Sequence, residues 1–291
     1  MKIAIFGGSF DPPHIGHEMI VHEALRHLDI DTLFVIPTYL NPLKCDFVAP
    51  ATKRITWLTQ LFETQQKVKI CDYEVKQQRR VYTIETIEYL LKTYEISKIY
   101  LIIGADNYKI FDQWRDHDKI QSHCELVVAS RDDTIYPKDL KKLNINAKIS
   151  SSKLRAHMDG AFIPKMIRNE VIEYYTRNIM EKRIERIVSI LDTNKAESIQ
   201  TFDMSNKDYI VDAVVIATTL GERHGAALLE TLKTELKDKG EIFLNIDESS
   251  DWAILDMGDI LVHLMSPAYR EKYNIEEFLT NRELELNQED H

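Results

Sequence analysis

The first part of the chain is organised around the stretch Phe6-Gly7-Gly8-Ser9-Phe10-Asp11-Pro12-Pro13-His14-Ile15-Gly16-His17. The apolar run at residues 2–6 predicts a buried strand of a parallel sheet. Apolar residues then recur at spacings of three and four over residues 15–28, which predicts a helix with one buried face. A glycine-bearing turn between strand and helix lets the backbone approach a ligand, and the helix N-terminus offers N–H groups to phosphate. His14 and His17 are three residues apart, so we expect both to face that phosphate.

Composition limits the class of protein. The chain has 291 residues, of which 44% are hydrophobic and 29% charged, values typical of soluble globular proteins with room for two modest domains. It contains neither an apolar run of membrane-spanning length nor a charged and then apolar leader, so we expect a cytoplasmic protein with no membrane partner. Cys45, Cys71 and Cys124 are far apart and form no CxxC pair, which argues against disulfides and structural zinc.

The charge is unevenly distributed along the chain. Residues 1–180 hold 25 Lys and Arg against 23 Asp and Glu, and residues 181–291 hold 12 against 24, so the two parts carry +2 and −12. We therefore expect two domains with these bounds, the second ending in an acidic tail at residues 284–291. An acidic surface is poorly suited to binding RNA phosphates. A basic protein is the more natural partner, and a solvated acidic face without a partner is the alternative.

The opening stretch resembles the (T/H)xGH signature of the nucleotidylyltransferase superfamily, in the version found in nicotinate-mononucleotide adenylyltransferases. The resemblance covers residues 1–176 and implies an α/β fold with a Rossmann-like parallel sheet. It also implies that His14 and His17 are catalytic. The residues implied to contact ATP in this stretch are Gly7, Gly8, Ser9, Phe10 and Gly16.

Two loops resemble the family's binding elements for the mononucleotide. Residues 37–44 follow a predicted strand and match an Asn/Ser-Pro-x-Lys loop, which implies that Lys44 holds the mononucleotide's phosphate. A solvent-exposed lysine is the ordinary interpretation of such a residue.

Residues 79–86 match Arg-x-x-Tyr-Thr-x-Asp-Thr, with Glu85 in place of the usual Asp. This match implies that Tyr82 and Thr83 lie beside the pyridine ring. The alternative is that Thr83 simply caps a helix. Whether Arg79 or Arg80 meets phosphate stays open.

Three further segments resemble ligand-binding elements of the same family. A predicted strand at residues 99–103 precedes Gly104 and Asp106, which match a Gly-x-Asp motif. The match implies that Gly104 contacts ATP and that Asp106 contacts the nucleotide or a metal-bound water. Trp114 matches a tryptophan that stacks on the nicotinate ring.

The three serines at residues 150–152 predict a helix N-cap. By resemblance, this helix start grips the ATP phosphates through Ser151, Ser152 and Arg155.

The chemistry implied by the resemblance is adenylyl transfer. The mononucleotide's 5′-phosphate attacks ATP, pyrophosphate leaves, and the protein supplies positioning and charge stabilisation. Mg²⁺ is expected to be carried on the ATP phosphates, with no protein metal site. Within the enzyme class, nicotinamide mononucleotide or phosphopantetheine is the alternative substrate.

The second half begins without a Gly, Pro or Ser linker. We expect a helix at residues 164–180, another at 184–191, a strand at 198–202 and a long helix opened by Gly221. Residues 252–264 predict a β-hairpin with a Met-Gly turn. The strings Lys195-Ala196-Glu197-Ser198-Ile199, Glu222-Arg223-His224, and those at residues 208–218 and 252–263 resemble the ribosomal silencing factor family over residues 183–281.

This second resemblance implies a small mixed-sheet α/β domain that represses translation. Such a domain binds a protein on the intersubunit face of the large ribosomal subunit and blocks subunit joining. The candidate contacts are Asp208, Tyr209, Arg223, His224, Trp252 and Asp256. Core packing and turn chemistry are the alternative roles for Trp252, Asp256 and His263. A dimerisation or regulatory module is the alternative function of this half, and a homodimer stays open.

Overall fold

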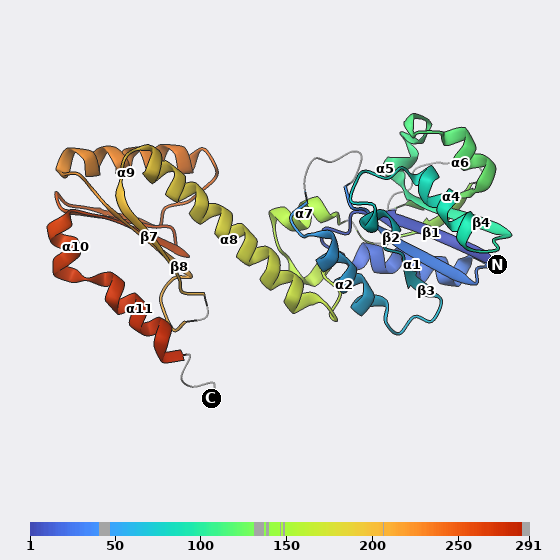
Figure 1. Cartoon of the computed structure of the whole chain (residues 1–291), viewed down its shortest axis with the longest axis horizontal. Helices are drawn as coiled ribbons and strands as arrows, with labels where there is room; N and C mark the ends of the chain where they lie inside the picture. The colour runs from blue at the N-terminus through green and yellow to red at the C-terminus, as the bar shows by residue number, and fades with distance from the viewer. Residues whose placement is uncertain are drawn as a thin grey trace. The chain divides into compact units, whose positions relative to one another are not determined.

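The computed structural model describes residues 1–40, 47–130, 137, 140–145, 147, 149–205 and 207–286. The chain divides into two units, Met1–Asn178 and Ile179–His291 (Figure 1). Each unit has its own sheet and its own hydrophobic core. No helix in the described ranges is both long and apolar enough to cross a membrane.

The first unit is built on a six-stranded parallel sheet. Its order is β3-β2-β1-β4-β5-β6. The strands are β1 (Lys2–Gly8), β2 (Thr32–Pro37), β3 (Val68–Ile70), β4 (Lys98–Gly104), β5 (Glu125–Ser130) and β6 (Lys141–Asn144). The central strands are continuous apolar runs because both of their faces are covered. The predicted parallel α/β fold of this part is confirmed.

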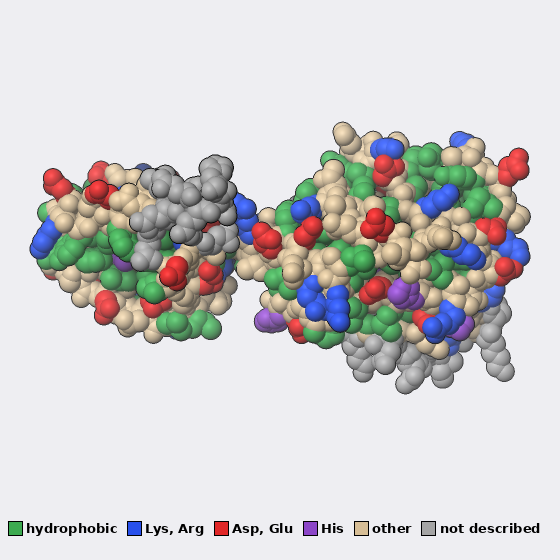
Figure 2. Space-filling view, turned by 90° about the horizontal axis from the view of Figure 1, so that it is seen from below, with side chains coloured by type: hydrophobic (Ala, Val, Ile, Leu, Met, Phe, Trp, Pro, Cys, Tyr) green, Lys and Arg blue, Asp and Glu red, His purple; other side chains and the backbone are tan. Residues whose placement is uncertain are grey.

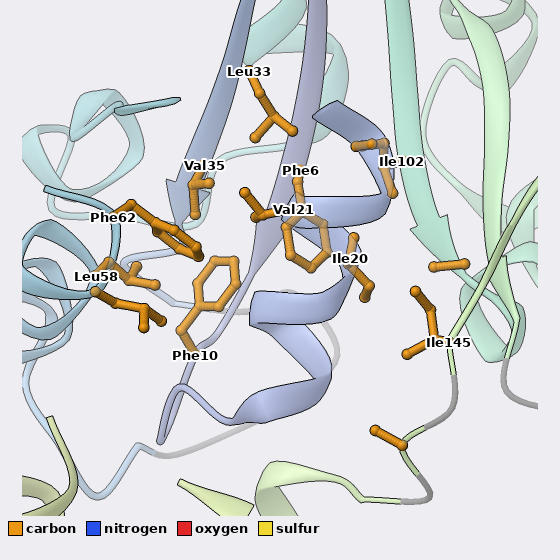
Figure 3. Packing of buried hydrophobic residues seen from close by; sticks show 14 of the residues in the cluster. Phe6, Phe10, Ile20, Val21, Leu33, Val35, Leu58, Phe62, Ile102 and Ile145 are labelled. Atoms are coloured by element: carbon orange, nitrogen blue, oxygen red, sulfur yellow. The ribbon is translucent and has the colours of Figure 1, made fainter. Parts of the chain in front are cut away.

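Helices cover both faces of this sheet. They are α1 (Ile15–His27), α2 (Ala51–Phe62), α3 (Tyr73–Lys76), α4 (Thr83–Thr93), α5 (Ala105–Tyr108), α6 (His117–His123) and α7 (Ser151–Ala156), with 3₁₀ turns η1 (Phe111–Gln113) and η2 (Gly160–Phe162). One core lies between the sheet and α1 and α2, where Phe6, Val21 and Leu58 pack together (Figure 3). The core on the other face includes Ile87 of α4 and Ile120 of α6.

The strand order reverses at β1. Along the chain, β1 is followed by β2 and β3 on one side, and β4 and β5 then add on the other side. In open parallel sheets, the connections diverge at such a point and leave a crevice at the carboxyl ends of the strands. The Gly7-Gly8 end of β1 lies at this point.

The second unit has a mixed five-stranded sheet in the order β7-β8-β11-β10-β9. The strands are β7 (Glu197–Asp203), β8 (Ala213–Thr218), β9 (Asn245–Glu248), β10 (Trp252–Asp256) and β11 (Ile260–Met265). Strands β8 and β11 are parallel, and the predicted hairpin is the antiparallel pair β10 and β11. Helix α9 (Glu222–Lys237) packs on one face, and the region of α10 (Pro267–Tyr273) and α11 (Ile275–Leu286) on the other.

The helices predicted at residues 164–180 and 184–191 are wrong as separate elements. They form one helix, α8 (Arg168–Thr193), and the division between the two units falls within it. No Gly or Pro interrupts residues 168–193, and Glu181-Lys182-Arg183 are strong helix formers, so nothing local ends the helix. The expected tail also begins later than predicted, because α11 includes residues 284–286. Residues 287–291 lie outside the described ranges.

Candidate active site

A cavity of about 350 Å³ lies at the carboxyl ends of β1, β2 and β4, where the strand order reverses. This is the position at which open α/β sheets bind ligands. Five of the residues predicted to contact ATP or the mononucleotide line it, namely Gly7, Gly8, Tyr82, Thr83 and Trp114. The sequence therefore selected residues from three separate segments that the fold brings to one cavity.

Tyr82 and Trp114 form the aromatic part of the wall. Tyr82 is the N-cap of α4, and the Arg115 guanidinium lies 4.8 Å from the centroid of its ring. Trp114 packs against Phe111 with ring centroids 5.4 Å apart. Tyr82, Trp114 and Arg115 all line the cavity, so its wall offers both aromatic surface and positive charge to a ligand.

Thr83 is the first residue of α4, so the alternative in which it caps the helix is wrong. The backbone of Tyr82 is extended, and the Glu85 carboxylate accepts its N–H at 3.0 Å. Glu85 thus completes a capping box from the third helical position. This leaves the Thr83 side chain on the cavity wall.

Arg79 and Arg80 differ in their surroundings. Arg79 donates to the Glu85 carboxylate at 2.7 Å and to the Arg80 carbonyl at 2.8 Å. Its hydrogen bond lowers the pKa of Glu85. Arg80 lines the cavity, and its backbone bridges to Leu40. Of the two arginines, Arg80 is therefore the one that lines the cavity, whereas Arg79 pairs with Glu85.

Glu74 is a cavity residue that the sequence analysis missed. Its side chain comes from α3, is 7% exposed and accepts a hydrogen bond from the Thr86 hydroxyl at 2.8 Å. Burial raises its pKa to about 7, partly offset by that hydrogen bond. Other wall residues outside the prediction are Thr38, Asn107, Gln113 and Arg115. A lone Glu in a short polar segment carries no pattern that marks it as a wall residue.

His14 and His17 stand at the start of α1. The two rings stack with centroids 3.7 Å apart, and His17 Nδ1 accepts the His14 backbone N–H at 3.2 Å. His14 is buried and His17 is half-exposed. A Cβ at Gly16 would lie 3.0 Å from the His14 ring, so a side chain at this position would crowd the stacked pair. Together the two imidazoles border the N–H groups of the helix start.

Asp11 was also missed by the sequence analysis. It lies in the loop before α1, and its buried side chain binds several groups from other segments. It is 1% exposed, and its carboxylate accepts the N–H groups of Val48 at 3.1 Å and Ala49 at 2.9 Å. The Tyr175 hydroxyl of α8 also donates to it. Burial and this contact with the carboxylate raise the pKa of Tyr175, so the hydroxyl stays a donor.

The start of α7 is tied to the same loop. Ser150 is the N-cap, and Ser151 donates its hydroxyl proton to the Pro12 carbonyl at 3.0 Å. Arg155 donates to the Asp11 carbonyl, lies 3.5 Å from its carboxylate and reaches Ser152 Oγ at 3.3 Å. The N-termini of α1 and α7 therefore share one loop. Both helix starts present N–H groups and positive dipole ends suited to phosphates.

Several predicted contacts lie elsewhere. Phe10 is 1% exposed in the core, and the Ser9 carbonyl accepts a hydrogen bond from buried Arg54. Gly104 ends β4, and the exposed Asp106 side chain lies 3.9 Å from Lys109 without lining the cavity. Lys44 lies outside the described residues. In the described ranges, no group of three or more His, Cys, Asp or Glu side chains could hold a metal ion.

The candidate contacts of the second unit fall into two groups. Trp252, Asp256 and His224 make bonds within the unit. The Trp252 indole donates to His263 at 3.1 Å, Asp256 accepts the Gly258 N–H at 2.8 Å, and His224 accepts the Leu220 N–H at 2.9 Å. Asp208 and Arg223 are exposed and Tyr209 is half-buried. In the view of Figure 2, hydrophobic side chains also reach the surface of this unit.

Comparison with known proteins matches two families to the chain. The cytidylyltransferase-like family matches residues 5–157, and the family described as ribosomal silencing factor during starvation matches residues 177–291. A relative from a Nitratiruptor species, named "Probable nicotinate-nucleotide adenylyltransferase", is 45% identical over 175 residues, which are 60% of this chain and 99% of the relative.

A relative of the same name from Campylobacter jejuni is 46% identical over 177 residues, 61% of this chain and 98% of its own length. Among solved structures, the Plasmodium falciparum nicotinic acid mononucleotide adenylyltransferase complexed with NaAD is 19% identical. It covers 60% of this chain and 95% of its own, with a TM-score of 0.49.

Proposed function

The chain belongs to the nicotinate-nucleotide adenylyltransferase family and carries a ribosomal silencing factor domain in its C-terminal part, and from this we propose a two-part function. The first part transfers adenylyl from ATP to nicotinate mononucleotide and forms deamido-NAD and pyrophosphate. The second part binds the large ribosomal subunit and blocks subunit joining. We place the functional division near residue 180, within α8.

The cavity at the strand-order reversal is the observation that carries the enzymatic proposal. Its aromatic wall of Tyr82 and Trp114 suits a pyridine ring, and Arg80 and Arg115 supply positive charge for an anionic mononucleotide. At the Gly7-Gly8 end of β1, backbone can approach a ligand closely, since a Cβ at Gly7 would have no neighbour nearer than 3.9 Å. The mononucleotide therefore occupies this cavity.

The reaction needs no covalent enzyme intermediate. An oxygen of the mononucleotide's 5′-phosphate attacks the α-phosphorus of ATP. The bond from that phosphorus to the oxygen bridging the α- and β-phosphates breaks, and pyrophosphate leaves with the electron pair. Positioning two anions side by side requires fixed donors and positive charge, and the two helix starts offer both.

His17 and His14 donate to the phosphates as negative charge develops, and the start of α7, with Ser151, Ser152 and Arg155, holds the departing pyrophosphate. Arg155 is 24% exposed at its side chain, so it can turn from the Asp11 carbonyl toward a ligand. Lys44 is the proposed partner of the attacking phosphate. Mg²⁺ would enter with ATP and would supply charge neutralisation to the phosphates, while the residues named above hold and orient them.

Pyrophosphate release tests the enzymatic proposal. The full chain is given ATP and Mg²⁺ with nicotinate mononucleotide, nicotinamide mononucleotide or phosphopantetheine in parallel. We expect a strong preference for nicotinate mononucleotide, and His17→Ala should lower kcat/KM by about 10²–10³-fold. His27→Ala, at the exposed C-terminal end of the same helix, is the matched control. Absence of pyrophosphate release with all three acceptors would refute the proposal.

The second part of the proposal is supported by the matched family and by two exposed side chains of opposite charge, Asp208 and Arg223. Exposed charges on a surface that recognises a protein select the partner and steer its approach. Trp252 and His224 are bonded inside the unit, so we assign them to positioning the surface rather than to contact.

Co-sedimentation with isolated large ribosomal subunits tests this part. We expect the full chain to pellet with large subunits and to prevent their joining with small subunits. Arg223→Glu should weaken both effects, whereas Arg26→Glu, an equal charge change on the first unit, should leave them unchanged. A chain that forms homodimers and does not sediment with large subunits would instead favour a dimerisation or regulatory module.

A further inference from the structure

Glu74 is an acidic group in a cavity whose proposed ligand is anionic. Its side chain is buried, and one carboxyl oxygen accepts the Thr86 hydroxyl proton. Thr86 is itself 2% exposed in the first turn of α4, next to Tyr82 and Thr83 on the same wall. The Glu74 carboxyl is thus held in place by the helix whose start forms the proposed pyridine-binding wall.

The charge of this carboxyl matters because the cavity is small. Within about 350 Å³, a bound ligand lies close to every wall group. Two like charges separated by such distances in a site shielded from water repel by an amount that changes binding about tenfold or more. A neutral Glu74 removes this repulsion, and its proton provides a hydrogen-bond donor that a carboxylate lacks.

We propose that Glu74 is a specificity-determining residue of the mononucleotide pocket, which accepts the acid form of the pyridine mononucleotide when Glu74 is protonated and disfavours it when Glu74 is ionised. The amide form carries one negative charge fewer on its ring, so ionised Glu74 penalises it less. This inference rests on the proposed adenylyltransferase function and adds the group that distinguishes acid from amide.

Among the described residues, few titratable or charged groups lie near Glu74, so the effect of each on the pH dependence of binding can be considered in turn. Across the cavity or beside Glu74 lie Glu85, Arg80, Arg115, Tyr73 and Cys71. Glu85 raises the pKa of Glu74, but it is itself held ionised by Arg79. The pKa values of Tyr73 and Cys71 are raised by burial, away from neutrality. Glu74, with a pKa of about 7, is the one of this set that changes charge near neutral pH.

The test is the ratio of kcat/KM for nicotinate mononucleotide to that for nicotinamide mononucleotide, measured across pH. A group whose ionisation affects both reactions equally cancels in the ratio. We expect the ratio to fall about tenfold from about pH 6 to about pH 8, mainly through KM of the acid substrate. In Glu74→Gln, which places a neutral side chain of the same shape in the cavity, the ratio should not change with pH. It should equal the ratio that the wild-type chain shows at about pH 6.

Glu88→Gln is the matched control. Glu88 lies on α4, pairs with Lys119 and does not line the cavity, so its removal should leave the slope of the ratio intact. A ratio that is independent of pH in the wild-type chain, or a slope that persists in Glu74→Gln, would overturn the inference. Turnover of neither mononucleotide would instead overturn the proposed function itself.

Calorimetry on the wild-type chain keeps the inference testable if Glu74→Gln does not fold. Binding is measured near neutral pH in buffers with different ionisation enthalpies, which reports the protons taken up. We expect more proton uptake with nicotinate mononucleotide than with nicotinamide mononucleotide, because the acid form favours protonated Glu74. Equal proton uptake with the two ligands would contradict the proposal.

Discussion

The loop at residues 9–14 of the first unit and the β10–β11 hairpin of the second unit use buried polar groups differently. In the loop, the buried Asp11 carboxylate binds two backbone N–H groups, a tyrosine hydroxyl and Arg155. In the hairpin, the Trp252 indole and the His263 imidazole form a neutral hydrogen-bonded pair. A buried charge can orient several groups of a site at once, whereas the Trp252–His263 pair joins two strands.

This comparison predicts that the loop is more sensitive to mutation than the hairpin. A charged group buried with several partners leaves all of them unsatisfied when it is removed. When one member of a neutral hydrogen-bonded pair is removed, only the other member is left unsatisfied. Three experiments, ordered by expected effect, examine the difference.

Asp11→Ala should have the largest effect. Removing the carboxylate leaves Arg54 and Arg155 with less compensation for their charge, and we expect a loss of about 3–5 kcal/mol in the free energy of unfolding. Burial already lowers the pKa of Arg54, and the Asp11 charge opposes this shift, so losing the carboxylate removes a group that stabilises the charged guanidinium. Urea denaturation measures the loss. Asp29→Ala, which removes an exposed carboxylate paired with Lys2, should change stability little, and equal losses in the two variants would contradict the buried-charge argument.

The stability of the hairpin should depend on pH through His263. Burial lowers its pKa from 6.5 to about 4, opposed by the charge of Glu276. Above about pH 6.5, both the folded and the unfolded chain hold His263 neutral. As the pH falls toward 4, the unfolded chain takes up the proton and the folded chain does not, so roughly 3 kcal/mol of stability is lost.

The difference between the wild-type chain and His263→Gln isolates this effect from that of other histidines. The glutamine amide oxygen can still accept the Trp252 indole proton. Urea denaturation of both chains between about pH 6.5 and about pH 4 should show the additional loss of stability in the wild type alone. Parallel curves would mean that His263 titrates normally in the folded hairpin.

Trp252→Phe should have the smallest effect of the three. The ring stays, but the indole N–H and its bond to His263 are lost, which costs about 1–2 kcal/mol. The measurement pairs urea denaturation with sedimentation on large ribosomal subunits. We expect lower stability and retained sedimentation. If the variant kept its stability but no longer sedimented with large subunits, Trp252 would be a contact residue. The claim that the Trp252–His263 pair stabilises the hairpin would then be wrong.

Local patterns in the sequence were enough to predict much of the fold. Strands appeared as continuous apolar runs at residues 2–6 and 99–103, and the helix after His14 appeared in its apolar spacing. Such periodicity depends only on which faces an element must bury. The end of a helix depends on competing signals, which is why two predicted helices joined into α8.

The motif residues located the cavity, although only part of the set lines it. Gly7, Tyr82 and Trp114 were found because each belongs to a recognisable string. Phe10 belongs to such a string as well and is nevertheless a core residue, because the same short string contains residues that pack and residues that face the cavity.

Local sequence patterns were sufficient to predict the order of elements, the two-part organisation and the segments that meet at the cavity. Tertiary contacts place Arg80 on the cavity wall, pair Arg79 with Glu85 and bury Asp11 and Glu74, and none of these could be predicted from a local pattern. The physical reason is that a side chain's charge and contacts depend on neighbours distant in sequence. Asp11 meets Tyr175 across 164 positions, and no local pattern records that meeting.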